Sequence, residues 1–167
     1  MDYVCLMTYD LKCGFHAPSD IMRRCILPRA MFSGTAAIRH CACLKRRFPE
    51  EKLLMGAAFY SRKWEDVPDR YHGFLQLTKT GGGYGPNYDK LADEYINKNG
   101  YVRYWDDEAK APFLFNGSTF ISYDDEESLA HKCAYVKRED IGGIFYWCHS
   151  GDTKGVLLRR IAKELEE

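Results

Sequence analysis

The sequence predicts an α/β fold built on a parallel sheet, and three short apolar segments carry this prediction. Each segment is rich in β-branched or aromatic residues and apolar on both faces, as strands of parallel sheets are. These segments are residues 3–10, 52–59 and 141–147. A helical pattern follows each segment, directly or after an intervening stretch, which is the order expected of three βα units.

Size and charge indicate a globular chain with no bulk attraction to nucleic acid or membrane. Of the 167 residues, 46% are hydrophobic and 29% are charged, and the net charge is zero. The apolar runs are too short to span a bilayer, and the first residues lack a signal-peptide pattern. The seven cysteines form an odd and clustered set, which favours reduced thiols over a disulfide framework.

The first strand is followed by an irregular stretch and then by a helix. Residues 11–32 contain glycines and prolines that interrupt regular secondary structure. Ser33 or Thr35 can cap a helix that runs to about Arg47, where Pro49 follows.

Residues 65–120 have a different pattern and predict a small α+β insertion between the second strand and its helix. We expect a loop at 81–87 and an amphipathic helix at 88–98, stopped by Asn99-Gly100. Short strands should follow, the last two joined by an Asn-Gly hairpin turn, at 101–105, 112–115 and 118–123.

The regular alternation resumes after the insertion. Asp124 and Glu127 form a capping pair that opens a helix ending near Arg138. After the third strand, residues 155–166 predict a closing amphipathic helix.

Six blocks of this sequence, in the correct order, resemble those of glycoside hydrolase family 18, the chitinases. The blocks are MTYD at 7–10, GAAFYSR at 56–62, YWDD at 104–107, APFLFNG at 111–117, SYDDE at 122–126 and GGIFYW at 142–147. The resemblance is close over 1–10 and 48–167 and poor over 11–47.

The resemblance implies a fold and a division of the chain. The family fold is an eight-stranded β/α barrel, so this chain would be a partial TIM barrel holding the last three βα units. Residues 1–64 and 121–167 would belong to the barrel, and 65–120 would be the α+β chitinase insertion that walls one side of the substrate groove.

The resemblance also implies an activity. Family members cleave β-1,4-linked N-acetylglucosamine polymers by a substrate-assisted, retaining mechanism. In it a glutamic acid protonates the glycosidic oxygen while the acetamido oxygen of the sugar attacks the anomeric carbon. The expected partner is therefore chitin or another N-acetylglucosamine-containing glycan, with no cofactor and no metal.

Site residues carry over from the matching blocks. Tyr9 would hydrogen-bond the acetamido group, and Asp10 would help to orient the sugar as an assisting catalytic residue. Met7, Tyr60 and Arg62 would contribute to substrate binding in the same groove.

Three further residues complete the implied groove. Trp147 would be the aromatic floor under the sugar, and Trp105 and Asp106 would belong to the insertion wall. The chemistry agrees with these residue types, because a pyranose offers an apolar face to an aromatic ring and an edge of hydroxyl and amide groups to hydrogen bonds.

The catalytic acid of the family lies in an Asp-x-x-Asp-x-Asp-x-Glu run, which this sequence does not contain. A whole barrel also needs about 250 residues. We therefore expect the C-terminal part of a larger enzyme, from a truncated reading frame and inactive alone. The parent enzyme would be secreted or at the cell surface, as the family mostly is.

Two alternatives stay open at this point. The chain could be a non-catalytic, lectin-like module that binds N-acetylglucosamine polymers. It could also be one half of a split barrel, completed by a second chain or by self-association of an exposed sheet edge.

The segment 12–47 departs from the family pattern through ordinary divergence or a local reading-frame slip. Its clustered thiols and imidazoles, with His40, Cys41 and Cys43 at the centre, lack the paired Cys-x-x-Cys spacing of structural zinc sites. The sequence therefore predicts no metal site.

Overall fold

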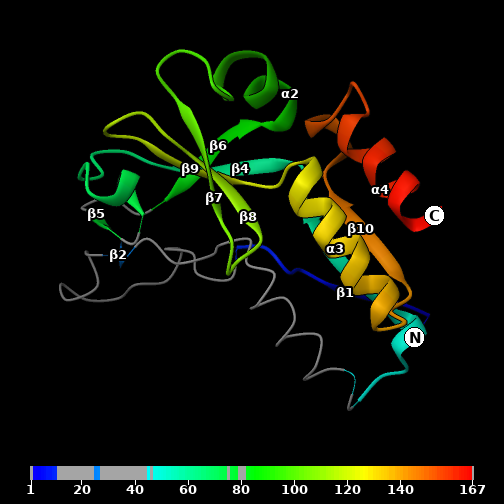
Figure 1. The fold of residues 1–167 in the computed structure, drawn as a ribbon. Coiled ribbons are helices and arrows are strands. Elements are labelled where there is room, and N and C mark those ends of the chain that lie inside the picture. The colour runs from blue at the N-terminus through cyan, green and yellow to red at the C-terminus, as the bar shows by residue number, and fades with distance from the viewer. Residues whose placement is uncertain are drawn as a thin grey trace.

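The computed structural model describes residues 2–10, 25–26, 45, 47–74, 76–78 and 82–166. These residues form an α/β structure with a parallel sheet beside an antiparallel one (Figure 1). The strands are β1 Val4–Leu6, β2 Cys25–Ile26, β3 Leu53–Ala58, β4 Tyr60–Trp64, β5 Leu77–Thr78, β6 Gly83–Asn87, β7 Val102–Asp106, β8 Ala111–Phe115, β9 Phe120–Tyr123 and β10 Gly143–Trp147. The helical segments are α2 Tyr88–Lys90, α3 Glu126–Arg138, α4 Val156–Glu166, a π-helical segment Leu91–Tyr95 and short 3₁₀ turns at Glu50–Lys52, Tyr71–Gly73 and His149–Gly151.

The three predicted strands pair in parallel, in the order β1-β3-β10. The first is shorter than predicted, because only Val4–Leu6 pair with β3. On the other side of β3 the pairing runs as far as Trp147 opposite Ala58. The carboxyl ends of all three strands therefore meet at one edge of the sheet.

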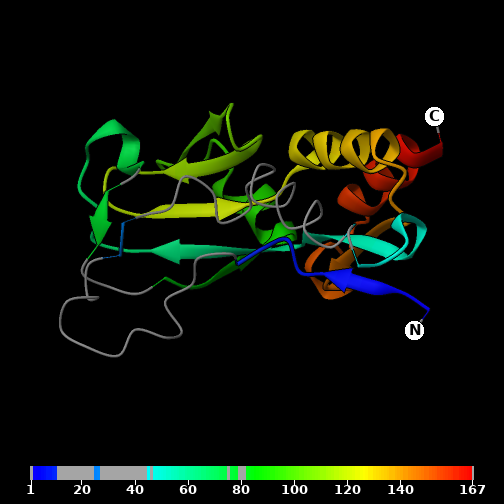
Figure 2. The ribbon, with the colours of Figure 1, turned by 90° about the horizontal axis from the view of Figure 1, so that it is seen from below.

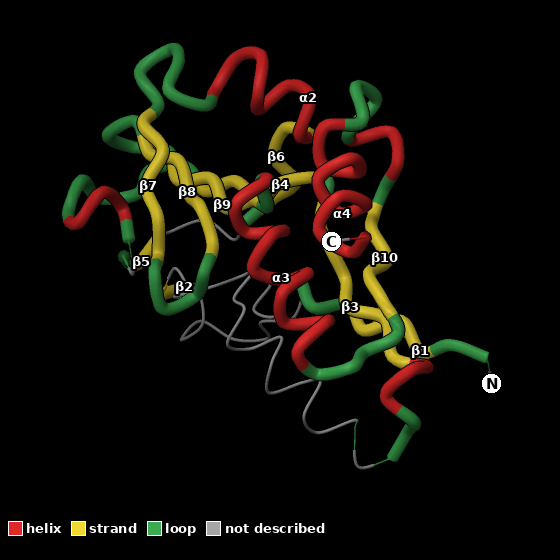
Figure 3. The backbone as a smooth tube through the Cα atoms, turned by 45° about the vertical axis from the view of Figure 1, so that its right-hand side comes forward, coloured by secondary structure: helices red, strands yellow, loops and turns green. Residues whose placement is uncertain are grey.

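Helices α3 and α4 lie together on one face of the parallel sheet (Figure 3). Buried apolar side chains of the central strand, such as Leu53 and Ala57, pack against Val136 of α3 and Leu157 of α4. Both predicted helices are thus confirmed, and each buries one face against the sheet.

The cap of α3 differs from the prediction. Asp125, not Asp124, is the N-cap, and its carboxylate accepts hydrogen bonds from the backbone N–H of Glu127 and of Ser128. The Ser128 hydroxyl accepts from the backbone N–H of Asp125, which completes a capping box. Asp124 is instead buried and faces Lys132, an arrangement taken up below.

The second sheet is antiparallel, with the strand order β6-β4-β9-β8-β7. Its strand β4 was not predicted, and it begins only one residue after β3. The sheet takes strands from 60–64 and 120–123, on either side of the predicted insertion range, as well as from within it. Figure 2 shows this sheet beside the parallel sheet, with both chain ends on the side of the parallel sheet.

The second sheet and the segments that connect its strands form the antiparallel lobe. Two elements of this lobe differ from the predictions. The predicted loop at 81–87 is largely the edge strand β6, which pairs with β4. The predicted helix at 88–98 ends at Tyr95, because Ile96 is extended with a ψ of 106° and Asn97 follows with a left-handed φ of 56°. The Lys98 ammonium then donates to the exposed carbonyls of Ala92 and Asp93 and so closes the helix end.

The predicted hairpin between β8 and β9 is confirmed. The Asn116 side chain accepts from the backbone N–H of Ser118 and of Thr119, and Gly117 has a φ of +98° that suits glycine.

The predicted helix from Ser33 or Thr35 to about Arg47 lies mostly outside the described residues, as does the cluster of His40, Cys41 and Cys43. Among the described helices, none has the length and apolar character needed to cross a bilayer.

Candidate functional site

Asp10, at the carboxyl edge of the parallel sheet, is the centre of a network of charged hydrogen bonds. Arg62 donates to both oxygens of its carboxylate, from Nε at 2.8 Å and from Nη2 at 2.6 Å. The Tyr60 hydroxyl donates to the same carboxylate at 2.6 Å. Strand β4 therefore carries two side chains that hold Asp10 across 50 residues of sequence.

The bidentate pair is largely removed from water. Arg62 is 1% exposed, and the Asp10 side chain is 22% exposed. The pair therefore joins a buried guanidinium to an Asp10 side chain that still reaches the surface with one edge.

Tyr9 packs beside this network as part of an aromatic group. Its ring lies edge-on to Tyr60 at 5.9 Å and tilted against Phe145 at 6.1 Å. Burial and the neighbouring Asp10 raise the pKa of Tyr9, and burial with the hydrogen bond to Asp10 raises that of Tyr60. Both phenols therefore remain neutral and can donate hydrogen bonds.

Gly56 on β3 allows Tyr9 to lie this close to the sheet. A Cβ at position 56 would be 2.7 Å from the Leu6 carbonyl oxygen and 2.7 Å from Cε1 of Tyr9. The backbone N–H and carbonyl of Gly56 are both hydrogen-bonded to the Thr8 hydroxyl, which fixes the end of β1 against β3.

Trp147 lies at the end of β10 with 60% of its surface exposed. Alternate residues of a strand share a face, so Trp147 lies on the same face as Phe145, which contacts Tyr9. Tyr146 belongs to the opposite face, where it stacks on Phe59 at 4.5 Å. The indole is thus on the Tyr9 side of the sheet and open to solvent.

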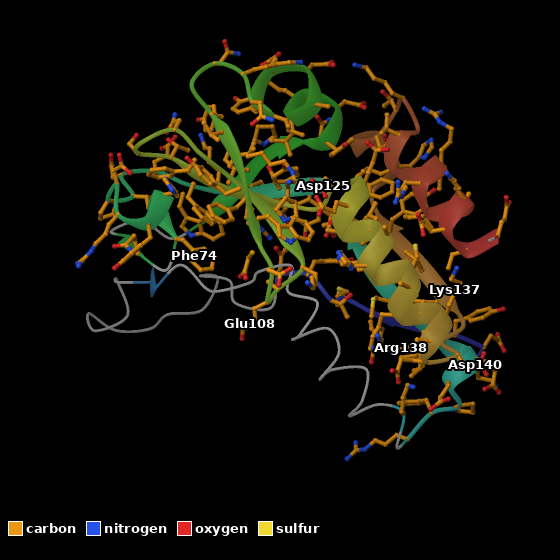
Figure 4. The ribbon with its side chains drawn as sticks, in the orientation of Figure 1. Phe74, Glu108, Asp125, Lys137, Arg138 and Asp140 are labelled. Atoms are coloured by element: carbon orange, nitrogen blue, oxygen red, sulfur yellow. The ribbon has the colours of Figure 1, made fainter. Side chains whose placement is uncertain are left out.

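The remaining predicted residues are placed differently. Met7 is 66% exposed, just beyond β1. The Asp106 carboxylate accepts from the backbone N–H of Glu108 and of Ala109, so it closes the β7–β8 turn that Glu108 marks in Figure 4. In the part of the chain that the structure describes, no hydrogen bond or ion pair joins Asp106 to Asp10.

Trp105 lies on the other face of the antiparallel sheet. Cross-strand pairing places Arg62, Ser122, Phe113 and Tyr104 in one row and on one face. Trp105 follows Tyr104 and so faces the opposite way, where its ring is 5.8 Å from that of His131 on α3. The structure therefore does not bring Trp105 to the Asp10 network.

A buried ion pair behind the site was not predicted as such from the sequence. The Lys132 ammonium of α3 lies 2.5 Å from the Asp124 carboxylate, and both side chains are at most 4% exposed. Lys132 also donates to the Gly56 carbonyl, and Asp124 accepts from the backbone N–H of Ala58. The pair thus holds the end of β3 that precedes Tyr60.

Together these side chains offer an exposed indole, neutral phenols and an anchored carboxylate at one sheet edge. This set suits an uncharged ligand with apolar faces and hydroxyl or amide edges. Among the described residues, no three His, Cys, Asp or Glu side chains are grouped to hold a metal ion.

Comparison with known proteins identifies the family. The sequence profile described as "Glycosyl hydrolases family 18" matches residues 1–152. The chain belongs to glycoside hydrolase family 18. Chitinase A1 of Niallia circulans is 40% identical in an alignment of 125 residues that covers 70% of this chain and 18% of that protein.

Solved family 18 structures share the fold over the whole chain. A family 18 N-acetylglucosaminidase from Paenibacillus barengoltzii matches with a TM-score of 0.86 and 42% identity, covering 99% of this chain and 49% of that one. The chain therefore spans about a fifth of the length of one relative and half of the other.

Family 18 homologues bind N-acetylglucosamine oligomers. A mutant class V chitinase from Nicotiana tobaccum, 26% identical with a TM-score of 0.79, was solved in complex with NAG4 and is covered over 49% of its length by all of this chain. A chitinase from Cycas revoluta, 21% identical with a TM-score of 0.76, was solved in complex with (GlcNAc)3.

Proposed function

We propose that this chain forms the sugar-binding, C-terminal part of a chitinase-like glycoside hydrolase that acts on β-1,4-linked N-acetylglucosamine polymers. The observation that carries the proposal is the Asp10 carboxylate held by Arg62 and Tyr60 on the side of the sheet where Trp147 is exposed. It joins an aromatic platform to fixed hydrogen-bonding groups, which is what recognition of an N-acetylated sugar requires.

The parallel sheet supports a place in a β/α barrel. We propose that β1, β3 and β10, with α3 and α4, are the last three βα units of the family barrel, and that the antiparallel lobe is its insertion. Of the predicted site residues, Tyr9, Asp10 and Trp147 lie at or just beyond the carboxyl ends of the parallel strands, where barrel enzymes carry their active sites.

Each site residue then has a role that follows from its chemistry. Trp147 stacks on the apolar face of one sugar. The neutral Tyr9 hydroxyl can donate to the acetamido oxygen, and the Asp10 side chain can accept from the acetamido N–H. Arg62 aligns Asp10 through two hydrogen bonds, and Tyr60 donates the third hydrogen bond that fixes it.

Hydrolysis needs a proton donor for the glycosidic oxygen, and the Asp-x-x-Asp-x-Asp-x-Glu run of the family does not occur in this sequence. Both oxygens of the Asp10 side chain already accept hydrogen bonds from Arg62, so Asp10 is not placed as the missing proton donor. We therefore propose that this chain binds N-acetylglucosamine oligomers without cleaving them.

Binding and turnover can be tested separately on the purified chain. We expect N-acetylglucosamine oligomers to bind in isothermal titration calorimetry and Trp147→Ala to weaken binding at least tenfold. Tyr71→Ala, which removes another exposed aromatic side chain, should leave binding unaltered. No product should appear when the chain is incubated with chitin oligomers. Absence of binding, or equal binding by the Trp147 variant, would refute the proposal.

The missing proton donor also favours a second candidate, a lectin-like role in which binding itself is the function. A split barrel is the related possibility, because β1 and β10 each pair on one side only among the described strands, and an open strand edge can accept another strand. Gel filtration distinguishes the two: a monomer that binds oligomers fits the lectin-like role, and a dimer fits the split barrel.

A further inference from the structure

We propose that Tyr84, on the edge strand β6, is a second aromatic platform of the sugar site and binds the sugar residue next to the one held at Asp10. The inference rests on the proposed function and extends the site from the parallel sheet onto the antiparallel lobe. The family blocks quoted above do not contain this residue, and the sequence pattern places it in a loop at 81–87 with no site role.

Tyr84 lies directly opposite Arg62 in the pairing of β6 with β4, so both side chains are on one face of the sheet. The centre of its ring is 3.8 Å from Cζ of Arg62. Arg62 is 1% exposed, whereas Tyr84 is 67% exposed. The guanidinium therefore covers one side of the ring, and the solvent-exposed part must include the other side.

Tyr84 is connected to Asp10 through a single side chain. Its ring is 5.6 Å from that of Tyr60, tilted by 57°, and the Tyr60 hydroxyl donates to Asp10. A ligand that reaches Asp10 therefore needs to extend only past Tyr60 to meet the exposed side of Tyr84.

The neighbours of Tyr84 leave its ring uncovered. Gly83 and Gly85 flank it, and a Cβ at Gly85 would be 2.4 Å from the Ser61 hydroxyl oxygen, so a larger residue cannot easily stand there. Because β6 is the edge of its sheet, no further described strand lies beside it. A large aromatic ring between two glycines on a sheet edge suits stacking against a flat apolar ligand face.

Shielding Arg62 is the alternative role for Tyr84, and oligomer length separates the two roles. If Tyr84 acts only by positioning Arg62, its loss should weaken binding of every oligomer, including the disaccharide, by the same factor. If Tyr84 is a platform, its loss should weaken binding only of oligomers long enough to reach it.

The test is calorimetric titration of the purified chain with N-acetylglucosamine oligomers from the disaccharide to the hexasaccharide. Tyr84→Ala should bind the shortest oligomers as the parent chain does and the longer ones roughly three- to tenfold more weakly. Tyr84→Phe retains the ring and should bind all of them normally. Tyr71→Ala is the control for loss of an exposed tyrosine elsewhere in the lobe.

Three results would overturn the assignment. Equal binding by Tyr84→Ala at every length, with weaker binding by Trp147→Ala, would remove Tyr84 from the site but leave the proposed function standing. A uniform loss at every length would reduce Tyr84 to a positioning residue. No binding by the parent chain would refute the proposed function and this inference together.

Discussion

At the scale of single residues, the site depends on the pairing of a buried positive charge, that of Arg62, with the Asp10 side chain. Arg62 is withdrawn from water and lies between the Asp10 carboxylate and the Tyr84 ring. Removing water strengthens the attraction between the pair but makes either charge costly without the other. In the proposed function, the same two groups thus contribute both to stability and to ligand binding.

Loss of the Asp10 side chain should therefore lower the stability of the fold. Asp10→Ala leaves a buried guanidinium without its carboxylate, and we expect the free energy of unfolding to fall by about 2–4 kcal/mol in urea titration. Asp93→Ala is the matched control, since Asp93 pairs with Lys154 at the surface with both side chains more than half exposed. That change should cost less than about 1 kcal/mol, and equal losses would contradict the argument.

Gly56 allows a second residue-level prediction. Gly56→Ala places a methyl group against the Leu6 carbonyl and the Tyr9 ring, so we expect a loss of about 1–3 kcal/mol in the free energy of unfolding and weaker oligomer binding through displacement of Tyr9. Gly83→Ala, where no atom lies within 4 Å of the added methyl group, should change neither quantity appreciably. A tolerated Gly56→Ala would show that Tyr9 can move without consequence.

Sequence reasoning could group some of these residues but not all. Tyr9, Asp10 and Trp147 follow apolar runs, so their position at strand ends could be read directly. The facing direction of Trp105 depends on the register of β7 against β8, which the sequence does not show. Tyr84 was hidden because its glycine neighbours are typical of a loop.

At the scale of elements, the start of α3 is the junction between the two sheets. Asp125 caps the helix at the end nearer the antiparallel lobe, and Lys137 and Arg138 lie at its other end (Figure 4). About two turns into the helix, Lys132 donates to both the Asp124 carboxylate and the Gly56 carbonyl. The helix thereby fixes β9 and β3 relative to each other.

The contribution of the Lys132–Asp124 ion pair to stability can be tested within one helix. Lys132→Met leaves Asp124 buried without a cation and should lower the free energy of unfolding by about 3–5 kcal/mol. Lys137→Met changes an exposed lysine of the same helix and should stay within about 0.5 kcal/mol. Similar effects of both changes in urea titration would show that the buried pair has no special weight.

Local sequence predicted elements well where one periodicity dominates. The parallel strands, α3 and α4 follow from apolar patterning. Strand β4 does not, because its polar residues Ser61, Arg62 and Lys63 are typical of a loop until their cross-strand partners are known. The helix that begins at Tyr88 ends earlier than predicted. Its end is closed by hydrogen bonds from the Lys98 side chain to two carbonyl groups, which composition does not reveal.

At the scale of the whole molecule, buried phenols couple stability to alkaline pH. Burial is the main cause of a raised pKa in Tyr9, Tyr60, Tyr88 and Tyr123. In the unfolded chain these groups ionise near pH 10, whereas in the folded chain they stay protonated to higher pH. The unfolded state then binds fewer protons, so the stability these groups contribute is complete below about pH 10 and declines as pH rises above it.

Tyr88→Phe should make this decline shallower. We expect the free energy of unfolding to fall between about pH 9 and about pH 11, with a slope reduced by up to about 1.4 kcal/mol per pH unit in the variant. Tyr71→Phe removes an exposed phenol and should leave the slope as it is. Urea titrations across this pH range give both slopes, and an unchanged slope for Tyr88→Phe would contradict the assignment.

The passage from β3 to β4 through the single residue Phe59 has a mechanical consequence. Phe59 is 1% exposed, its N–H donates to the Trp147 carbonyl and its own carbonyl accepts from the Tyr88 N–H. A buried one-residue connection leaves no flexible hinge between the two sheets, so we expect no domain closure of the antiparallel lobe over a ligand. Selection among glycans would then depend on the shape of a rigid, preformed site, and a glycan of the wrong size would be excluded because the site does not adapt to it.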